Sequence, residues 1–387
     1  MSGGLTADGL AKFGAVAASY IGDDKVPGLV ALVAHGDQVH VKTLGSLSIG
    51  GPAVQRDSLF RIASTTKPIT GAATLALARE GLLALDEPVD RLLPELANPR
   101  VLRQMDGPLD DTVPATRAIT VRDLLTFTFG FGMDVGMFVS PEPWPVVAAA
   151  TGLCTIGPPM PDAMPDPDTW IAGLGSLPLL AQPGERWLYN TGAHVLSVLC
   201  ARAAGTSYAD ALRSRVLEPL GMRDTAFFTS DVDRLPTAYM PTPEGLTVWD
   251  PPDGQWSRPP EFADGAAGLV STADDLLAFA RVLLRGGDPI LTAAMVGEMT
   301  RDHLTAEQRA GGQAFLGERG WGFCQSVVID GPYAGAYGWD GGLGSTWLVD
   351  PARDLTVIVL TQRMFDSPQP PQVHVDLQSA AYAALGN

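Results

Sequence analysis

Ser64 and Lys67 are the pair of residues whose types and spacing most directly indicate chemistry in this chain. They lie in residues 60–68, which read FRIASTTKP. A serine three residues before a lysine on a helix places the hydroxyl and the amine on one face, about one turn apart. An amine in that position can remove the proton that keeps a serine hydroxyl a poor nucleophile. The pair therefore predicts nucleophilic catalysis by Ser64 with Lys67 as its partner.

Lysine is rare in this sequence, which makes Lys67 more informative. The chain has four lysines and 22 arginines. Arginine keeps its proton at physiological pH because its pKa lies above about 12. A lysine in such an arginine-rich chain is favoured where a group must be able to lose its proton.

Two further segments carry candidate site residues. Tyr189 follows the Pro-Gly turn at residues 183–184 and precedes a helical pattern, which places it at a loop-to-helix corner. Such a tyrosine is typical of half-buried packing, but beside a lysine its phenol pKa would fall, and it would serve as general base and then as acid. Residues 339–345, WDGGLGS, are typical of a glycine-rich turn or of a strand whose backbone N–H faces a developing oxyanion.

The elements that must position these residues come from both ends of the chain. Apolar, β-branched runs at 29–34 and 39–44, separated by Gly36-Asp37, predict a hairpin. An almost wholly apolar helix over 66–80 carries Lys67 through the middle of the protein. Further strands are expected at 321–329, 333–339, 345–349 and 355–361, and further helices at 10–20 and 372–385. The predicted fold class is α+β, an antiparallel sheet built from both chain ends and flanked by helices, with an inserted, mainly helical lobe.

We divide the chain into an α/β lobe, residues 1–85 and 310–387, and a helical lobe with long loops, residues 86–309. The stretch 129–170 holds eight prolines and four methionines, so it cannot be one regular element. It is either a surface excursion or a wall or lid of an apolar pocket. Residues 236–260, rich in proline and glycine, are expected to form a loop. Helices in this lobe are expected at 121–127, 194–204, 207–217 and 272–284.

Composition excludes several classes of function. A formal charge of −17 without a basic cluster disfavours nucleic acid as a partner. No run approaches the roughly 20 apolar residues of a membrane span, and the N-terminus lacks a secretory signal pattern. Three widely spaced cysteines and five scattered histidines favour reduced thiols in the cytoplasm over a disulfide framework, a metal site or a histidine-based triad. We expect a small molecule as the partner, no cofactor and no metal; the oligomeric state is left open.

In combination, these segments resemble the penicillin-recognising serine hydrolases: class C β-lactamases, D-alanyl-D-alanine carboxypeptidases and, most closely, family VIII carboxylesterases. The resemblance implies a β-lactamase/transpeptidase-like fold, with Ser64 as the acylated nucleophile, Lys67 assisting its deprotonation and Tyr189 as partner base. It also implies an oxyanion hole formed by the backbone N–H groups of Ser64 and Gly342. The similar segments, in the family's order, are residues 60–67, 85–89, 121–126, 183–189, 219–225, 268–272 and 339–350.

One departure from the family pattern concerns the third motif. Trp339 stands where β-lactamases and carboxypeptidases have lysine or histidine, and Asp340 follows it before Gly341. This resembles the Trp-Gly-Gly pattern of family VIII esterases, with Asp340 in place of the middle glycine. An apolar indole and an added negative charge both disfavour a substrate that bears a carboxylate. We expect these three residues to contact the substrate.

Two other departures lie around the predicted cleft. Thr191 takes the asparagine position of the Tyr-x-Asn motif, while Asn190 lies one residue early. Phe127 and Phe129 replace two polar residues of the family's Leu-Leu-Thr-His-Thr-Ser-Gly segment. We expect Phe127 and Thr191 to line a cleft that is more apolar than in the lactamases.

These departures favour a serine esterase that hydrolyses short-chain, mainly neutral carboxylic esters through an acyl-enzyme on Ser64. An ester alkoxide leaves more easily than an amide nitrogen. Ester hydrolysis is therefore the reaction that best suits a site without a polar or cationic residue to bind a substrate carboxylate. The alternatives on the same machinery are a β-lactamase, a D-amino-acid peptidase or an acyltransferase. A non-catalytic ligand-binding protein that retains the fold is a further alternative, although it would leave Ser64, Lys67 and Tyr189 unexplained together.

Overall fold

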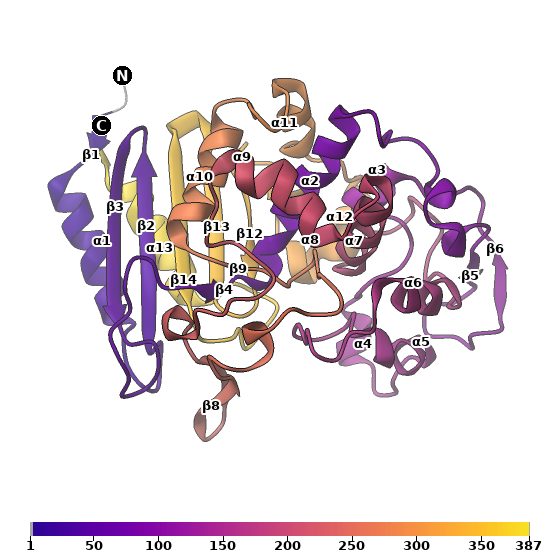
Figure 1. Ribbon diagram of the computed structural model, residues 1–387, viewed down its shortest axis with the longest axis horizontal. Helices are drawn as coiled ribbons and strands as arrows, with labels where there is room; N and C mark the ends of the chain where they lie inside the picture. Colours follow the sequence, from indigo (N-terminus) through magenta and orange to yellow (C-terminus); the bar gives the residue numbers. More distant parts are fainter. Residues whose placement is uncertain (1–2, 387) are drawn as a thin grey trace.

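A seven-stranded antiparallel sheet organises the computed structural model, which describes residues 3–386. Strand β14 lies between β13 and β2, with Val357 opposite Val33, so the C-terminal strands pair directly with the N-terminal hairpin (Figure 1). The prediction of one antiparallel sheet built from both chain ends is therefore confirmed. In spatial order the strands are β10 (Gly320–Trp321), β11 (Ser326–Val327), β12 (Tyr337–Gly341), β13 (Ser345–Asp350), β14 (Leu355–Thr361), β2 (Gly28–His35) and β3 (Gln38–Gly45).

Helices cover both faces of this sheet (Figure 1). Successive strand residues point to opposite faces, and the apolar run of β2 serves both. Its residues Leu29, Ala31 and Val33 belong to the core under α1 (Ala7–Ser19) and α13 (Gln372–Ala383). Its residues Val30, Leu32 and Ala34 belong to the main core on the other face, which includes α2 (Thr66–Arg79) and α10 (Ala273–Leu284).

A mainly helical region lies beside the sheet, to its right in Figure 1. Its longest helix, α7 (Thr191–Ala204), packs against α2 and is fully buried over most of its length. Besides α7 and α10, the α-helices in residues 86–319 are α3 (Val121–Leu125), α4 (Gly136–Val139), α5 (Pro145–Ala149), α6 (Pro167–Gly175), α8 (Tyr208–Leu212), α9 (Glu218–Leu220), α11 (Ala293–Met299) and α12 (Ala306–Leu316).

Four two-stranded pairs complete the described strands. The pair β4–β9 matters for the site because β4 leads directly into Ser64. The pairs are β1 (Gly3–Leu5) with β15 (Leu385–Gly386), β4 (Phe60–Arg61) with β9 (Val270–Ser271), β5 (Arg100–Leu102) with β6 (Thr112–Pro114), and β7 (Ala238–Thr242) with β8 (Gly245–Asp250).

Several predicted elements are corrected by the structure. The strand expected at 321–329 is two short strands, because Cys324, with a φ of 60°, turns the chain back between β10 and β11. The next strand begins at Tyr337 rather than at residue 333, after turns at Gly331 and Gly335. The helix expected at 207–217 is α8 followed by a π-helical turn over Arg213–Leu217. The loop expected at 236–260 contains the β7–β8 hairpin.

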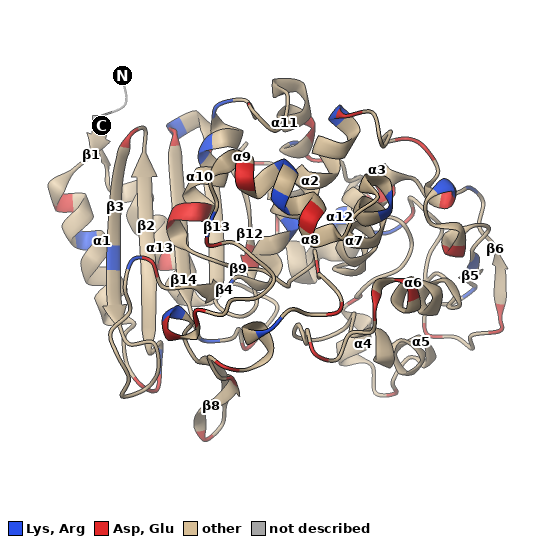
Figure 2. Ribbon diagram, in the orientation of Figure 1, with Lys and Arg blue, Asp and Glu red and all other residues tan. Residues whose placement is uncertain are grey.

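Acidic and basic residues are interspersed over the helices and loops (Figure 2). Within residues 3–386, no helix is both long enough and apolar enough to cross a membrane. Helix α10, which falls in the predicted helical lobe, packs on the sheet strands β2, β13 and β14. The division into two lobes and the cytoplasmic location stay predictions.

Candidate active site

Ser64 lies at the junction between β4 and α2, in the short 3-10 turn η1 (Ala63–Thr65). The N–H of Ile62 donates to the carbonyl of Leu269 at 3.0 Å, which fixes the entry to this turn. Ala63 has a φ of 43°, a left-handed conformation that is uncommon for a residue with a Cβ. Ser64 is half-buried, whereas Ala63 and Thr65 on either side of it are buried. The turn therefore presents the Ser64 side chain to a cavity and not to the core.

Strand β12 passes beside η1 without room for a side chain at Gly341. The hydroxyl of Ser345 donates to the carbonyl of Ile62 at 2.7 Å, which ties β13 to the turn. A Cβ at Gly341 would lie 2.1 Å from that same carbonyl oxygen. Glycine is thus required for this approach, and Gly342, the next residue, lines the same cavity as Ser64.

Lys67 is fully buried and reaches Ser64 directly. Its Nζ donates to Ser64 Oγ at 2.8 Å and to the carbonyl of Ala266 at 2.8 Å. Burial lowers the pKa of Lys67 from 10.5 to about 7, against the opposing effects of Asp264 and, less strongly, of Cys324. An amine with a pKa near neutrality can take a proton from a neighbouring hydroxyl at neutral pH.

Tyr189 lies on the other side of the amine, with Lys67 Nζ 4.7 Å from the centroid of its ring. Its hydroxyl accepts a hydrogen bond from Trp339 Nε1 at 2.8 Å. Burial raises the pKa of Tyr189 above its ordinary value, and hydrogen bonds with Ser64 and Trp339 offset this only in part. The expectation that the phenol pKa falls beside Lys67 is therefore wrong, because burial outweighs the favourable contacts. Tyr189 keeps its proton and is placed to donate it.

The backbone around Tyr189 is held at both ends. Tyr189 exchanges two hydrogen bonds with Met133, at 2.8 and 2.9 Å. Asn190 has a φ of 81° and a ψ of −59°, and the N–H of Thr191 donates to the carbonyl of Tyr189 at 3.1 Å, so the three residues form a γ-turn. The Asn190 amide donates to the carbonyl of Thr155 at 3.1 Å. Asn190 thus anchors a loop of the cavity wall.

A cavity of about 400 Å³ opens over Ser64 and Tyr189. Two of the sequence-predicted binding residues, Trp339 and Asp340, line it. The stretch 129–170 supplies part of the wall, in agreement with the pocket-wall alternative for this stretch. Its apolar lining includes Met133, Phe138, Pro158, Pro159, Phe315, Leu343, Met364 and Phe365.

Three other predicted binding residues do not line this cavity. Phe127 is fully buried behind Tyr189, with their ring centroids 6.1 Å apart, because it packs on Trp321 at 5.0 Å. Thr191 is fully buried in the first turn of α7, where its side chain faces the core. Gly341 approaches the backbone of Ile62 and not the cavity. These residues support the site from behind.

Comparison with known proteins decides the family. The family model described as Beta-lactamase matches residues 13–381. The chain belongs to the beta-lactamase family. It is a serine hydrolase with the β-lactamase/transpeptidase-like fold that the sequence predicts.

Individual relatives of this beta-lactamase-family chain agree. Esterase EstB of Burkholderia gladioli is 31% identical over 404 residues, covering 96% of this chain and 95% of the relative. Protein Rv1367c of Mycobacterium tuberculosis is 39% identical over 357 residues, covering 87% and 83%. The solved structure of EstCE1, a hydrolase with promiscuous acyltransferase activity, superposes with a TM-score of 0.82 at 26% identity, covering 97% of this chain and 99% of that one. The resemblance to family VIII esterases is confirmed.

Sequence reasoning missed several polar residues of the cavity, and three of them carry or can carry a charge beside the site residues. Arg319 lies with its Nη1 3.4 Å from Asp340 Oδ2 and with its guanidinium 5.1 Å from the Trp339 ring centroid. It therefore balances the negative charge that Asp340 adds to the wall. The other two, His194 and Asp264, lie beside Lys67. A signal existed only for Asp264, which lies four residues before the family-like segment 268–272.

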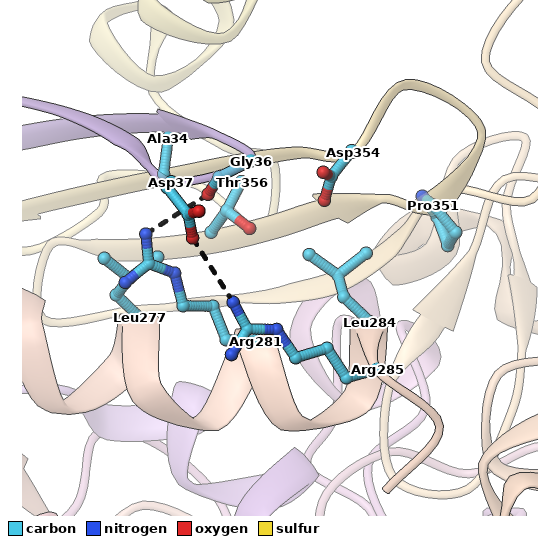
Figure 3. A pocket seen from close by; sticks show the side chains of 10 residues that line it. All are labelled: Ala34, Gly36, Asp37, Leu277, Arg281, Leu284, Arg285, Pro351, Asp354 and Thr356. Atoms are coloured by element: carbon cyan, nitrogen blue, oxygen red, sulfur yellow. Dashed lines mark hydrogen bonds and ion pairs between the residues drawn. The ribbon is translucent and has the colours of Figure 1, made fainter.

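Another cavity, of about 420 Å³, lies between α10 and the segment that joins the end of β2 to the start of β3, beside the start of β14 (Figure 3). Its two arginines are already engaged: Arg281 donates to the carbonyl of Gly36 at 3.2 Å, and Arg285 pairs with Asp37 at 3.5 Å. None of the described residues that line it is a serine, cysteine, lysine or histidine. The described lining of this cavity therefore lacks a pair of residues comparable to Ser64 and Lys67.

Proposed function

We propose that this protein is an esterase that hydrolyses short-chain, mainly neutral carboxylic esters through an acyl-enzyme on Ser64. The observation that carries the proposal is the 2.8 Å contact between Ser64 Oγ and Lys67 Nζ. The fall in the pKa of Lys67 to about 7 makes the neutral amine available near neutral pH. The names of its relatives Esterase EstB and the hydrolase EstCE1 support the same activity.

Acylation follows from the protonation states of the two partners. Neutral Lys67 takes the proton of Ser64 as Oγ attacks the ester carbonyl carbon, and the backbone N–H groups of Ser64 and Gly342 face the oxyanion. Tyr189 donates its proton to the departing alkoxide as the C–O bond breaks. The Lys67 ammonium then returns its proton to the Tyr189 phenolate, so both partners regain their starting states.

Deacylation uses the same groups in reverse. Water replaces the alcohol and gives one proton to Tyr189, relayed from there to Lys67, as its oxygen attacks the acyl carbon. Lys67 then returns a proton to Ser64 Oγ as the acyl group leaves as a carboxylic acid. Tyr189 is thus an acid in the first half and a relay in the second, which revises its sequence-predicted role as partner base.

The wall of the cavity favours neutral substrates. Its lining is mainly apolar, and its one arginine, Arg319, is paired with Asp340 among the described residues. Trp339 takes the position of the cationic residue that would hold a substrate carboxylate. A carboxylate-bearing β-lactam therefore lacks a free partner here, which supports the esterase over the lactamase alternative.

Acyl transfer is a second candidate function. EstCE1 is described as having promiscuous acyltransferase activity. The apolar lining of the cavity also suits an alcohol that competes with water for the acyl-enzyme. An acceptor alcohol would give its proton to the same relay of Tyr189 and Lys67.

Turnover of a chromogenic acetate or butyrate ester, measured beside a chromogenic cephalosporin, tests the proposal. We expect clear ester hydrolysis, little cephalosporin hydrolysis, and a loss of at least roughly 10³-fold in kcat for Ser64→Ala. Ser19→Ala, at an exposed serine that does not line this cavity, serves as the matched control and should retain the parent rate. Equal ester rates in the parent and in Ser64→Ala would refute the mechanism. Preferred cephalosporin turnover would identify a lactamase, and ester exchange with added alcohol would identify a transferase.

A further inference from the structure

Two buried titratable residues lie beside Lys67 and take no part in the proposed proton transfers. The side chains of His194 and Asp264 are 2% and 5% exposed, and His194 Nε2 lies 3.4 Å from Asp264 Oδ1. Both residues line the cavity that contains Ser64. Burying a carboxylate costs free energy unless neighbouring groups compensate its charge. The location of the Asp264 carboxylate beside the Lys67 amine therefore calls for an explanation.

Asp264 shapes the turn that holds the amine of Lys67. Its Oδ1 accepts the N–H of Ala266 at 2.7 Å, and its own carbonyl accepts the N–H of Gly268 at 2.8 Å. The carbonyl of Ala266, presented by this turn, accepts Lys67 Nζ at 2.8 Å. Because Nζ also bonds to Ser64 Oγ, the carboxylate is connected to the candidate nucleophile through the backbone of Ala266 and the amine of Lys67.

His194 is held in place by aromatic neighbours. Its ring stacks on Trp170 at 5.6 Å with an interplanar angle of 25°, and Phe262 lies 6.4 Å away. Burial lowers the pKa of His194, and the charge of Lys67 lowers it further, against the opposing effect of Asp264. His194 Nε2 lies 3.4 Å from Asp264 Oδ1, so the ring, itself fixed by its aromatic neighbours, limits the movement of the carboxylate.

The other titratable groups that face Lys67 are uncharged near neutral pH. Burial raises the pKa of the Cys324 thiol and the pKa of the Tyr189 phenol, so both keep their protons. His194 is neutral as well. Among the described residues, Asp264 is therefore the carboxylate whose charge acts on the amine.

We propose that Asp264, held by His194, is a positioning residue that keeps Lys67 against Ser64 and sets the pH above which the amine acts as a base. The inference rests on the proposed function. A carboxylate beside an amine favours the ammonium form, so Asp264 shifts the appearance of the neutral amine to higher pH. Without that charge, the acid limb of the pH profile, where kcat/KM falls as the amine gains a proton, would lie at lower pH.

The test is the pH profile of kcat/KM for a chromogenic acetate ester in two variants, one that changes the charge of residue 264 and one that changes its shape. Asp264→Asn keeps the shape and removes the charge; we expect its acid limb to move down by about one pH unit or more. Asp264→Glu keeps the charge and changes the shape; we expect a lower rate with the limb near that of the parent. A purely structural role would lower the rate of both proteins and move neither limb.

The matched control is Asp275→Asn. Asp275 is another buried carboxylate, which accepts from Thr225 at 2.8 Å and from the N–H of Asp224 at 2.9 Å and does not line the cavity. Its substitution should leave the acid limb in place. An equal shift in Asp275→Asn and Asp264→Asn would overturn the proposal, and so would an unmoved limb in Asp264→Asn.

A second variant covers the case in which Asp264→Asn does not fold. His194→Phe keeps the stacking ring and removes the Nε2 contact with Asp264, so the carboxylate is held less firmly beside the ammonium of Lys67. We expect a smaller shift of the limb to lower pH; an unmoved limb would overturn the proposal. Labelling of Ser64 by a fluorophosphonate in the parent separates the two claims. A labelled Ser64 with unmoved limbs refutes this inference alone, whereas an unlabelled Ser64 refutes the proposed function and the inference with it.

Discussion

Ser64 lies between two groups of residues, one mainly polar and one mainly aromatic. On one side, the lysine flank consists of Lys67, the Ala266 carbonyl, Asp264 and His194, connected by hydrogen bonds and by the 3.4 Å contact between His194 and Asp264. On the other side, the aromatic flank consists of Tyr189 and the rings that pack on it. Phe315 and Trp187 stack on Tyr189 at 5.1 and 5.6 Å, and Trp339 lies at 5.6 Å.

The comparison shows how one physical effect makes two different groups useful. Burial disfavours the charged form of any group. It lowers the pKa of the Lys67 amine to about 7 and raises the pKa of the Tyr189 phenol, so near neutral pH a large share of the amine is neutral and the phenol keeps its proton. A neutral amine accepts a proton and a neutral phenol donates one. The lysine flank therefore supplies the base of the proposed reaction, and the aromatic flank supplies its acid.

The largest effect is expected on the lysine flank. Lys67→Arg keeps the positive charge but removes the ability to lose a proton, so we expect kcat/KM to fall by at least about 10³-fold. Lys12→Arg, an exposed lysine paired with Asp8 at 2.7 Å, is the matched control and should retain parent activity. Thermal melts of both proteins would confirm that they are folded. Activity of Lys67→Arg within ten-fold of the parent would show that the amine does not act as the base.

The next largest effect is expected for the acid of the aromatic flank. Tyr189→Phe keeps the ring packing and removes the phenolic proton, so we expect kcat/KM for an alkyl ester, which reports acylation, to fall by about 10²-fold. The kcat/KM of a nitrophenyl ester, whose alcohol leaves without help, should fall much less. Tyr337→Phe, at a buried tyrosine outside the cavity, should affect the two esters equally. Equal losses for both esters in Tyr189→Phe would contradict the role of the phenol as an acid.

A smaller effect is expected at Trp339, which donates a hydrogen bond to the Tyr189 hydroxyl. Trp339→Phe removes the N–H that donates to the Tyr189 hydroxyl and would stabilise its phenolate, so we expect a loss of about ten-fold in kcat. Trp347, directly opposite Trp339 on β13, provides the matched control as Trp347→Phe. Steady-state kinetics on an alkyl ester would compare the two. If both variants lost the same activity, the effect would lie in packing and not in the hydrogen bond.

The smallest effect concerns the selectivity of the cavity between neutral and carboxylate-bearing substrates, at the pair Asp340 and Arg319 beside the aromatic flank. Asp340→Asn releases Arg319 from its carboxylate partner, so we expect kcat/KM for a carboxylate-bearing ester to rise about three-fold or more relative to a neutral ester. Arg319→Gln should lower the same ratio. A ratio unchanged in both proteins would mean that this pair does not face the substrate.

Local sequence patterns were enough to predict the sheet, helix α2 and the pairing of Ser64 with Lys67. The hairpin β2–β3 follows from two apolar runs around Gly36-Asp37, and a spacing of three residues on a helix brings hydroxyl and amine together. Both features depend on neighbours along the chain. The turn between β10 and β11 was missed because its residues, including Cys324, carry no glycine-rich or proline-rich signal of the usual kind.

The polar residues of the site were harder to predict because tertiary packing alone brings them together. His194 and Asp264 meet across 70 residues of sequence, and the seal over Tyr189 comes from segments as distant as Phe315. The sign of the Tyr189 pKa shift depends on that seal, which residue types do not reveal. Phe127 was expected in the cleft for its type, but its side chain turns toward Trp321 in the core.

The most direct test is the pH dependence of Ser64 phosphonylation by a fluorophosphonate, in which Oγ attacks phosphorus and fluoride leaves, followed by peptide mass spectrometry between pH 5 and 9. We predict a label on Ser64 whose rate of formation falls as the pH drops through about 7, because the Lys67 amine, with its pKa lowered to about 7, gains a proton there. A rate that stays constant over this range, or a label on another residue, would contradict the claim that neutral Lys67 activates Ser64.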